Sequence, residues 1–163
     1  MLLIFKKQIR YLMLACILVL AITPSAMAEN SVDKEKILSV LNQYETALNA
    51  NDVEGILSLY AENGVFMPQH SLPHIGKADI RKAYLKVFAA IDLDIDFKID
   101  EIERLSDKWA FARTRSEGTV VLRASGVTIT EGNQELFLLQ KDSTETWKIT
   151  RYIFSTTHPR APK

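Results

Sequence analysis

The hydrophobic pattern changes from a helical period to a strand period a little beyond the middle of the chain. Over residues 32–50 apolar positions recur every three or four residues, which predicts an amphipathic helix. A shorter helix is expected next. Asn51 and Asp52 are residue types that cap the start of a helix, and Asn63-Gly64 is typical of a helix end. A third helix follows, with an apolar stripe over residues 80–91.

Beyond residue 92, apolar and polar residues alternate in several runs, which is typical of strands. Because the helices come first and the strands follow, the pattern predicts an α+β domain with N-terminal helices packed on one face of an antiparallel sheet. The expected strands cover residues 95–99, 109–122, 127–130, 136–140 and 147–156, with turn residues between them.

The N-terminus has the pattern of a secretory signal peptide. Basic residues precede an apolar run over residues 11–22, and small residues follow at 25–28. We expect residues 1–28 to be removed after Ala28, leaving a domain over residues 29–163 in the periplasm or secreted, with no membrane attachment. The apolar run is shorter than the roughly 20 residues that span a bilayer. Cys16, the only cysteine, would leave with this segment.

Charge argues against nucleic acid as a partner. Without the three basic residues of the signal segment, seventeen basic residues stand against twenty acidic ones, a formal charge of −3. The basic residues are scattered and form no stripe, so no nucleic-acid surface is expected. Dinucleotide and phosphate-loop motifs are also absent from the sequence, and no cofactor is expected.

Several segments resemble the SnoaL-like, ketosteroid isomerase-like branch of the nuclear transport factor two-like superfamily: VLNQYETALN, LYAEN, IGK, NQELF and WKITRYIF. The resemblance covers residues 31–157. It implies a sheet curled into a cone, a cystatin-like roll, with a ligand pocket between sheet and helices, and a homodimer. Members include isomerases, cyclases, hydrolases and binding domains, so the fold does not fix the function.

The resemblance places Tyr44 at the phenol of the isomerase oxyanion hole, where it could donate to a carbonyl or enolate oxygen. The alternative is that Tyr44 is a core member of its helix stripe. Met67 or Pro68 stands where the isomerase needs its base, and Phe137 stands at the second acid position. Steroid isomerase chemistry of that design is therefore not expected.

Alternation along residues 109–117 puts Arg113 and Arg115 on one face, together with Glu117. If that face lines the pocket, two guanidinium groups favour a carboxylate or phosphate ligand. The alternative is that the small residues between them face inward and the arginines are solvated or paired. For hydrolysis, Glu117 or Glu135 could activate a water molecule.

His70 and His74 are four residues apart, but the prolines beside them argue against a helix that would align them. A zinc site needs further ligands, and none is obvious, so no metal is expected and His70 is placed at the pocket rim. Tyr152 is a pocket candidate because a buried tyrosine needs a polar partner.

The leading hypothesis is an exported domain that binds a small organic molecule, with an anion as one option, and has no evident catalytic set. One alternative is a cofactor-independent isomerase, cyclase or hydrolase that uses Tyr44 with Glu135 or Glu117. A dimeric interaction module is the other. The pocket candidates are Tyr44, Met67, His70, Arg113, Arg115, Glu135, Phe137 and Tyr152.

Overall fold

The computed structural model describes residues 23–158. The chain divides into two compact units, Met1–Asp33 and Lys34–Lys163, and the fold and site below belong to the second. Residues 1–22 of the expected signal peptide lie outside the described residues, so its removal stays a prediction. No helix within residues 23–158 combines the length and hydrophobicity that a membrane crossing requires.

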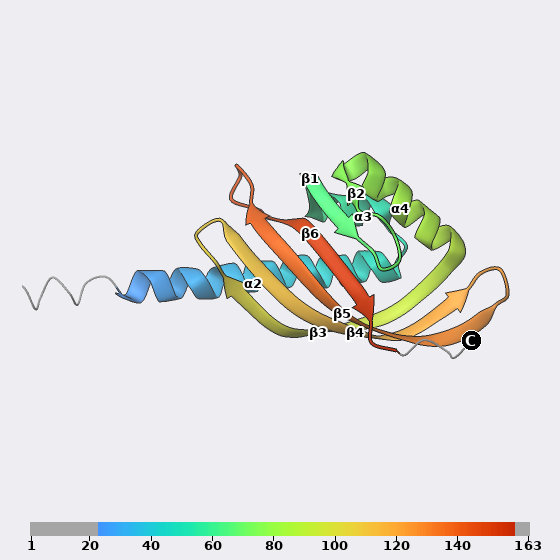
Figure 1. Ribbon diagram of the computed structural model, residues 1–163. Coiled ribbons are helices and arrows are strands. Elements are labelled where there is room, and N and C mark those ends of the chain that lie inside the picture. The colour runs from blue at the N-terminus through green and yellow to red at the C-terminus, as the bar shows by residue number, and fades with distance from the viewer. Residues whose placement is uncertain (1–22, 159–163) are drawn as a thin grey trace, which may run out of the picture. The chain divides into compact units, whose positions relative to one another are not determined.

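The strands form one six-stranded sheet in the order β2-β1-β6-β5-β4-β3 (Figure 1). Neighbours are antiparallel except β1 and β6, which run parallel. The predicted α+β class is confirmed, and the sheet is mixed rather than wholly antiparallel. The elements are α2 Thr23–Asn49, α3 Val53–Leu59, β1 Tyr60–Met67, β2 His74–Ile75, α4 Gly76–Ala90, β3 Ile91–Arg104, β4 Trp109–Leu122, β5 Val127–Lys141 and β6 Trp147–Thr156.

Several expected boundaries are wrong, and the strand expected over residues 95–99 is longer, Ile91–Arg104. Helix α3 begins as predicted, with the Asp52 carboxylate accepting from the Gly55 N–H at 2.9 Å, but it ends at Leu59 because the chain then pairs with β6 as strand β1. The two strands expected at 127–130 and 136–140 are one strand, β5. Gly132, expected in a turn, pairs with Glu117 of β4 inside it.

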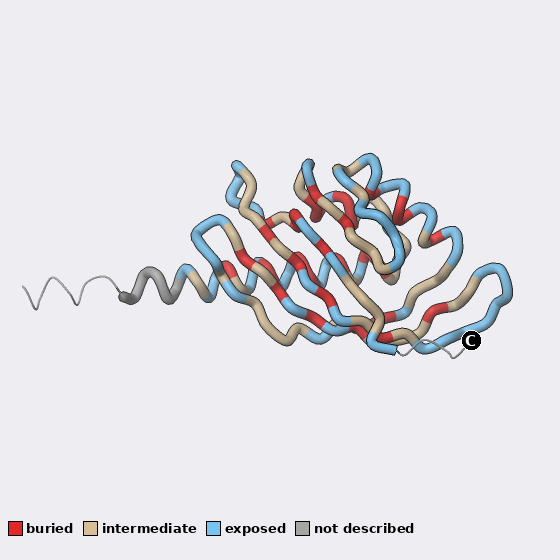
Figure 2. Tube along the Cα trace, viewed as in Figure 1, coloured by how far each residue is buried: buried red, intermediate tan, exposed pale blue. Residues whose placement is uncertain are grey.

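The inner face of the sheet carries the core. Along β4 the small side chains of Ala110, Ala112, Thr114 and Ser116 are at most 1% exposed, while the residues between them face outward. Figure 2 shows buried and exposed positions alternating in this way along the strands. The small side chains leave room above them, and the helices pack over this face.

Helix α2 is anchored to the outermost strand, β3. The Asn49 side chain donates to the Ile95 carbonyl at 2.7 Å and accepts from the Ile95 N–H at 3.0 Å. Glu45 accepts from the Phe97 N–H at 3.0 Å. These bonds use backbone groups of an edge strand that would otherwise be open to pairing. They also fix the position of Tyr44, one residue before Glu45, over the inner face.

Candidate functional site

A cavity of about 300 Å³ lies between the inner face of the sheet and helices α2 and α4. Its volume is at the lower end of the roughly 300–1,000 Å³ of small-molecule sites. Most of its walls are aliphatic or aromatic, and a few polar groups lie along β5. The lining residues are Tyr44, Leu48, Phe66, Pro68, Gln69, Tyr84, Val87, Ile91, Leu93, Ile95, Val120, Leu122, Ile129, Glu131, Asn133, Glu135, Tyr152 and Phe154.

Glu135 is a buried carboxylate on the cavity wall, only 5% exposed. Two hydroxyl groups of β4 donate to it, Thr114 Oγ1 to Oε2 and Ser116 Oγ to Oε1, the latter at 2.8 Å. Burial raises the pKa of Glu135 because a carboxylate loses its hydration, and hydrogen bonds from Thr114, Ser116 and Tyr152 oppose that rise. In the described part of the chain, no basic side chain pairs with it.

Three buried tyrosine hydroxyl groups lie in contact with one another at the cavity wall. The Tyr44 and Tyr84 oxygens are 2.5 Å apart, and those of Tyr60 and Tyr84 are 3.3 Å apart. Burial is the main cause that raises the pKa of each of these phenols, and of Tyr152, well above its ordinary value. The four phenols are therefore neutral at physiological pH, and each hydroxyl can donate or accept a hydrogen bond.

One wall of the cavity is a stack of aromatic rings centred on Phe66. Its ring lies 4.8 Å from that of Tyr84 with 13° between the planes, and 5.6 Å from Tyr152 with 12° between them. Phe154 continues the stack at 6.1 Å. Such packing gives the cavity a rigid apolar wall.

Three of the candidates from the sequence line this cavity: Tyr44, Glu135 and Tyr152. Phe137 lies just behind the wall, fully buried, with its ring 4.2 Å from that of Tyr152. Met67 does not line this cavity. In the parallel pairing of β1 with β6, Phe66 is the partner of Tyr152 and shares its face.

Arg113 and Arg115 do not line this cavity either. Their side chains are 52% and 49% exposed on the outer face, and both pair with Asp100, at 2.8 and 2.9 Å. The reason is the strand phase, since the small residues of β4 face the helices. Glu117, on the same outer face, lies 3.5 Å from Lys98 and cannot reach a molecule in the cavity.

His70 is exposed in the loop after β1, with φ of 60°, and does not line the cavity, although Pro68 and Gln69 before it do. Within the described residues, no group of three or more side chains is arranged to hold a metal ion. The sequence interpretation missed Tyr84 and Asn133 as cavity residues. Tyr84 carried a usable signal, because a tyrosine in a buried helix stripe needs a hydroxyl partner.

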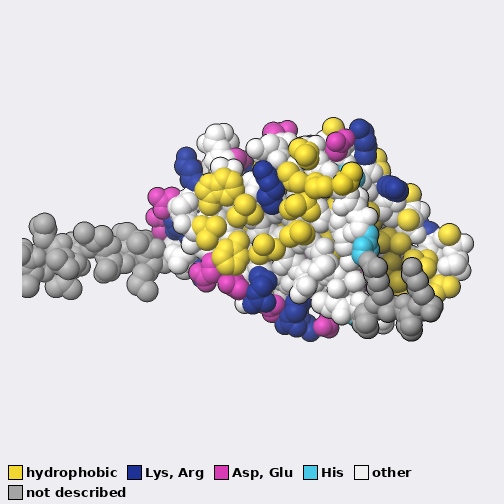
Figure 3. All heavy atoms as spheres, in the orientation of Figure 1, with side chains coloured by type: hydrophobic (Ala, Val, Ile, Leu, Met, Phe, Trp, Pro, Cys, Tyr) yellow, Lys and Arg dark blue, Asp and Glu magenta, His cyan; other side chains and the backbone are white. Residues whose placement is uncertain are grey.

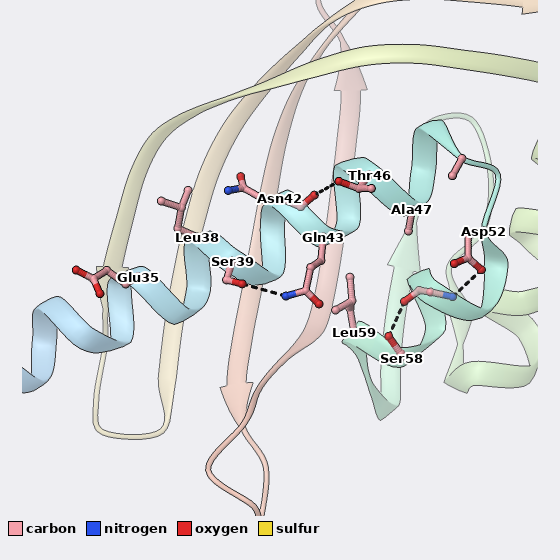
Figure 4. Close-up of a pocket in the computed structure, with 12 residues that line it drawn as sticks. Glu35, Leu38, Ser39, Asn42, Gln43, Thr46, Ala47, Asp52, Ser58 and Leu59 are labelled. Atoms are coloured by element: carbon pink, nitrogen blue, oxygen red, sulfur yellow. Dashed lines mark hydrogen bonds between the residues drawn. The ribbon is translucent and has the colours of Figure 1, made fainter.

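Two wider hollows, of about 520 and 720 Å³, lie on the surface along α2. Figure 4 shows the first, between α2 and α3. Its polar side chains serve local helix contacts, such as Gln43 donating to Ser39 at 3.0 Å and Asp52 capping α3. The second holds Asp100 and Arg113, which already pair. Both hollows are more open to solvent than the inner cavity.

Comparison with known proteins agrees with this architecture. The family model of the SnoaL-like domain matches residues 40–142. A ketosteroid isomerase-like protein from Erwinia carotovora atroseptica is 35% identical, over 76% of this chain and 95% of that one, with a TM-score of 0.74.

Two more distant structures share the fold alone. A nuclear transport factor 2-like superfamily protein from Salmonella enterica serovar Typhimurium is 19% identical over 80% of this chain and 95% of that one, with a TM-score of 0.71. A protein provisionally named scytalone dehydratase, from Novosphingobium aromaticivorans, is 18% identical over 83% and 94%, also with a TM-score of 0.71. By its family match and its 35% identical relative, this chain belongs to the SnoaL-like family, whose fold binds small molecules and sometimes catalyses their reactions.

Proposed function

We propose that this protein is an exported SnoaL-like domain that binds one small, mostly apolar organic molecule in the inner cavity. The observation that carries the proposal is a mostly apolar hollow with a few polar groups on one wall, the usual form of a small-molecule site. An anionic ligand has no support in this geometry. The charged residues that line the cavity, Glu131 and Glu135, are both acidic.

A cavity-filling variant tests this proposal. Val87 of α4 lines the cavity, whereas Leu85, two residues earlier, is 55% exposed. Thermal unfolding is measured with a panel of small aromatic and alicyclic alcohols, amines and acids. A ligand at a hundred times its Kd stabilises by about 2.7 kcal/mol, a shift of several degrees.

We expect at least one compound to protect the wild type and the Leu85→Phe control, and to lose its effect on Val87→Phe. The proposal fails if no compound protects the wild type, or if Val87→Phe is protected equally well.

Export is part of the proposal and is supported by the sequence of residues 1–28 alone. The full chain is expressed in a Gram-negative host, and the product is recovered from the periplasm and medium for N-terminal sequencing. The proposal predicts a product that begins at Glu29. A product that stays in the cytoplasm and keeps Met1 would contradict it.

We also propose that the domain forms a homodimer through the outer face of the sheet. Leu136 and Ile153, each 45% exposed, are paired neighbours on β5 and β6. Figure 3 shows hydrophobic side chains gathered over this face. Exposed apolar groups of this kind are commonly covered by a partner.

The dimer is tested by light scattering at micromolar concentration. We expect a dimeric mass for the wild type and for Leu85→Asp, and a monomeric mass for Ile153→Asp. A monomeric wild type would refute the dimer.

A second candidate function, proton transfer, is favoured by one observation. Glu135 and Tyr44 both line the cavity, so a carboxylate and a phenol are available to the same bound molecule. The assay is deuterium incorporation from heavy water into small enolisable ketones, followed by NMR. Catalysis predicts exchange that Glu135→Gln abolishes and Tyr44→Phe slows. Exchange no faster than in buffer would exclude this reaction for those ketones.

A further inference from the structure

The polar groups that β5 places on the cavity wall are two carboxylates and one amide. Glu131, Asn133 and Glu135 alternate along β5, so their side chains lie on one face, and all three line the cavity. Among the described lining residues, the two glutamates carry charge and none is lysine, arginine or histidine. The charged groups on this wall are therefore negative.

The side-chain carbonyl oxygen of Asn133, Oδ1, accepts no hydrogen bond from the described residues. Nδ2 of the same side chain donates to Ser116 Oγ at 3.5 Å, which turns Oδ1 away from that hydroxyl. Oδ1 is buried and has no hydrogen-bond partner within the described part of the chain. A buried acceptor left in this state is costly, and an N–H or O–H group from a bound molecule would satisfy it.

The same Ser116 hydroxyl links Asn133 to Glu135, since Ser116 Oγ donates to Glu135 Oε1 at 2.8 Å. The two residues therefore lie close together on the cavity wall. Glu135 receives hydroxyl donors, but hydroxyls do not neutralise its charge. A carboxylate has about four lone-pair sites, and a buried one is most stable when a cation pairs with it.

The aromatic stack forms another part of the cavity wall. The rings of Phe66, Tyr84, Tyr152 and Phe154 all line the cavity. An ammonium group is attracted to the face of an aromatic ring, most strongly where water is excluded. The same rings give an apolar body a large contact surface.

We infer that the molecule bound in this cavity is a small organic amine, held as its ammonium ion by Glu135 and Asn133, with its apolar body against the aromatic stack. This inference rests on the proposed binding function and names the class of ligand. It differs from the anionic ligand considered from the sequence, because the arginines that suggested an anion lie on the outer face.

Three probes with the same aromatic body separate the possibilities: phenethylamine, phenethyl alcohol and phenylacetate. Their Kd values are measured by isothermal titration on the wild type, on Glu135→Gln and on Glu117→Gln, a control on the outer face of the neighbouring strand. We expect phenethylamine to bind at least about tenfold more tightly than phenethyl alcohol, as for a hydrogen bond to a charged group. Glu135→Gln should remove that preference and leave the alcohol nearly unchanged.

The possible results separate failure of the amine ligand from failure of the binding function. If the alcohol or phenylacetate binds as tightly as the amine, the amine inference is wrong and the binding function stands. If Glu135→Gln keeps the full preference for the amine, the assignment to Glu135 is wrong. If none of the probes binds the wild type, both proposals are overturned for aromatic ligands of this size. The comparison of probes on the wild type holds even if Glu135→Gln does not fold.

Discussion

Replacing Phe66 by alanine tests the orientation of β1 and the aromatic wall together. Phe66 is 3% exposed, and four rings lie within 6.1 Å of its own, those of Tyr84, Tyr152, Phe154 and His74. Removing a buried phenylalanine costs about 3–5 kcal/mol, because burial is lost and a cavity remains. Met67, the next residue, is half-buried and on the opposite face. Met67→Ala should cost about 1 kcal/mol or less.

The assay is urea unfolding followed by circular dichroism at one protein concentration. A domain of this size has a stability of about 5–15 kcal/mol, so Phe66→Ala should remove a large share of it. The midpoint should fall while the slope stays unchanged, because the surface exposed on unfolding is similar. Equal losses for Phe66→Ala and Met67→Ala, or a larger loss for Met67→Ala, would refute the strand phase on which the cavity depends.

Three further variants give independent predictions. Tyr44→Phe removes one of two hydroxyl partners of Tyr84 and should lower the free energy of unfolding by about 1–2 kcal/mol; no loss in urea would contradict the hydroxyl contact. The raised pKa of Glu135 favours its protonated form in the folded state, so the stability that this group contributes should be fully present below the ordinary pKa of 4.5 and be lost as pH rises through the raised value. Glu135→Gln should flatten this part of the profile of Tm against pH, and an unchanged profile would argue against burial of the carboxylate. Arg115→Gln removes an exposed partner of Asp100 and should leave both Tm and probe binding unchanged. Weaker binding of the probes by this variant would indicate that Arg115 contacts the ligand.

The long periodic segments were predictable from local pattern. The alternation over residues 109–122 and 147–156 gave β4 and β6 with their observed bounds, and the apolar stripe placed α4. Strand β1 was not predictable in this way. Asn63 and Gly64 favour a helix stop, but the conformation of this segment is decided by pairing with β6, which lies far along the chain.

The site was only partly predictable because alternation defines two faces without saying which one faces inward. On β4 either the small residues or Arg113 and Arg115 could have lined the pocket. In the structure the arginines face outward and pair with Asp100, which lies at a register shift in β3. A bulge of this kind has no clear local signal. Asn133 was missed for a similar reason, since it was expected in a turn.

The most direct test of the central claim is methyl NMR of the wild-type chain with saturating phenethylamine. The cavity is lined by Val87, Leu93 and Ile95, whereas Leu136 and Ile153 are exposed on the opposite face of the sheet. The account predicts that the methyl signals of the first three residues shift and those of the last two do not. Shifts confined to Leu136 and Ile153, or none at millimolar concentrations, would contradict it.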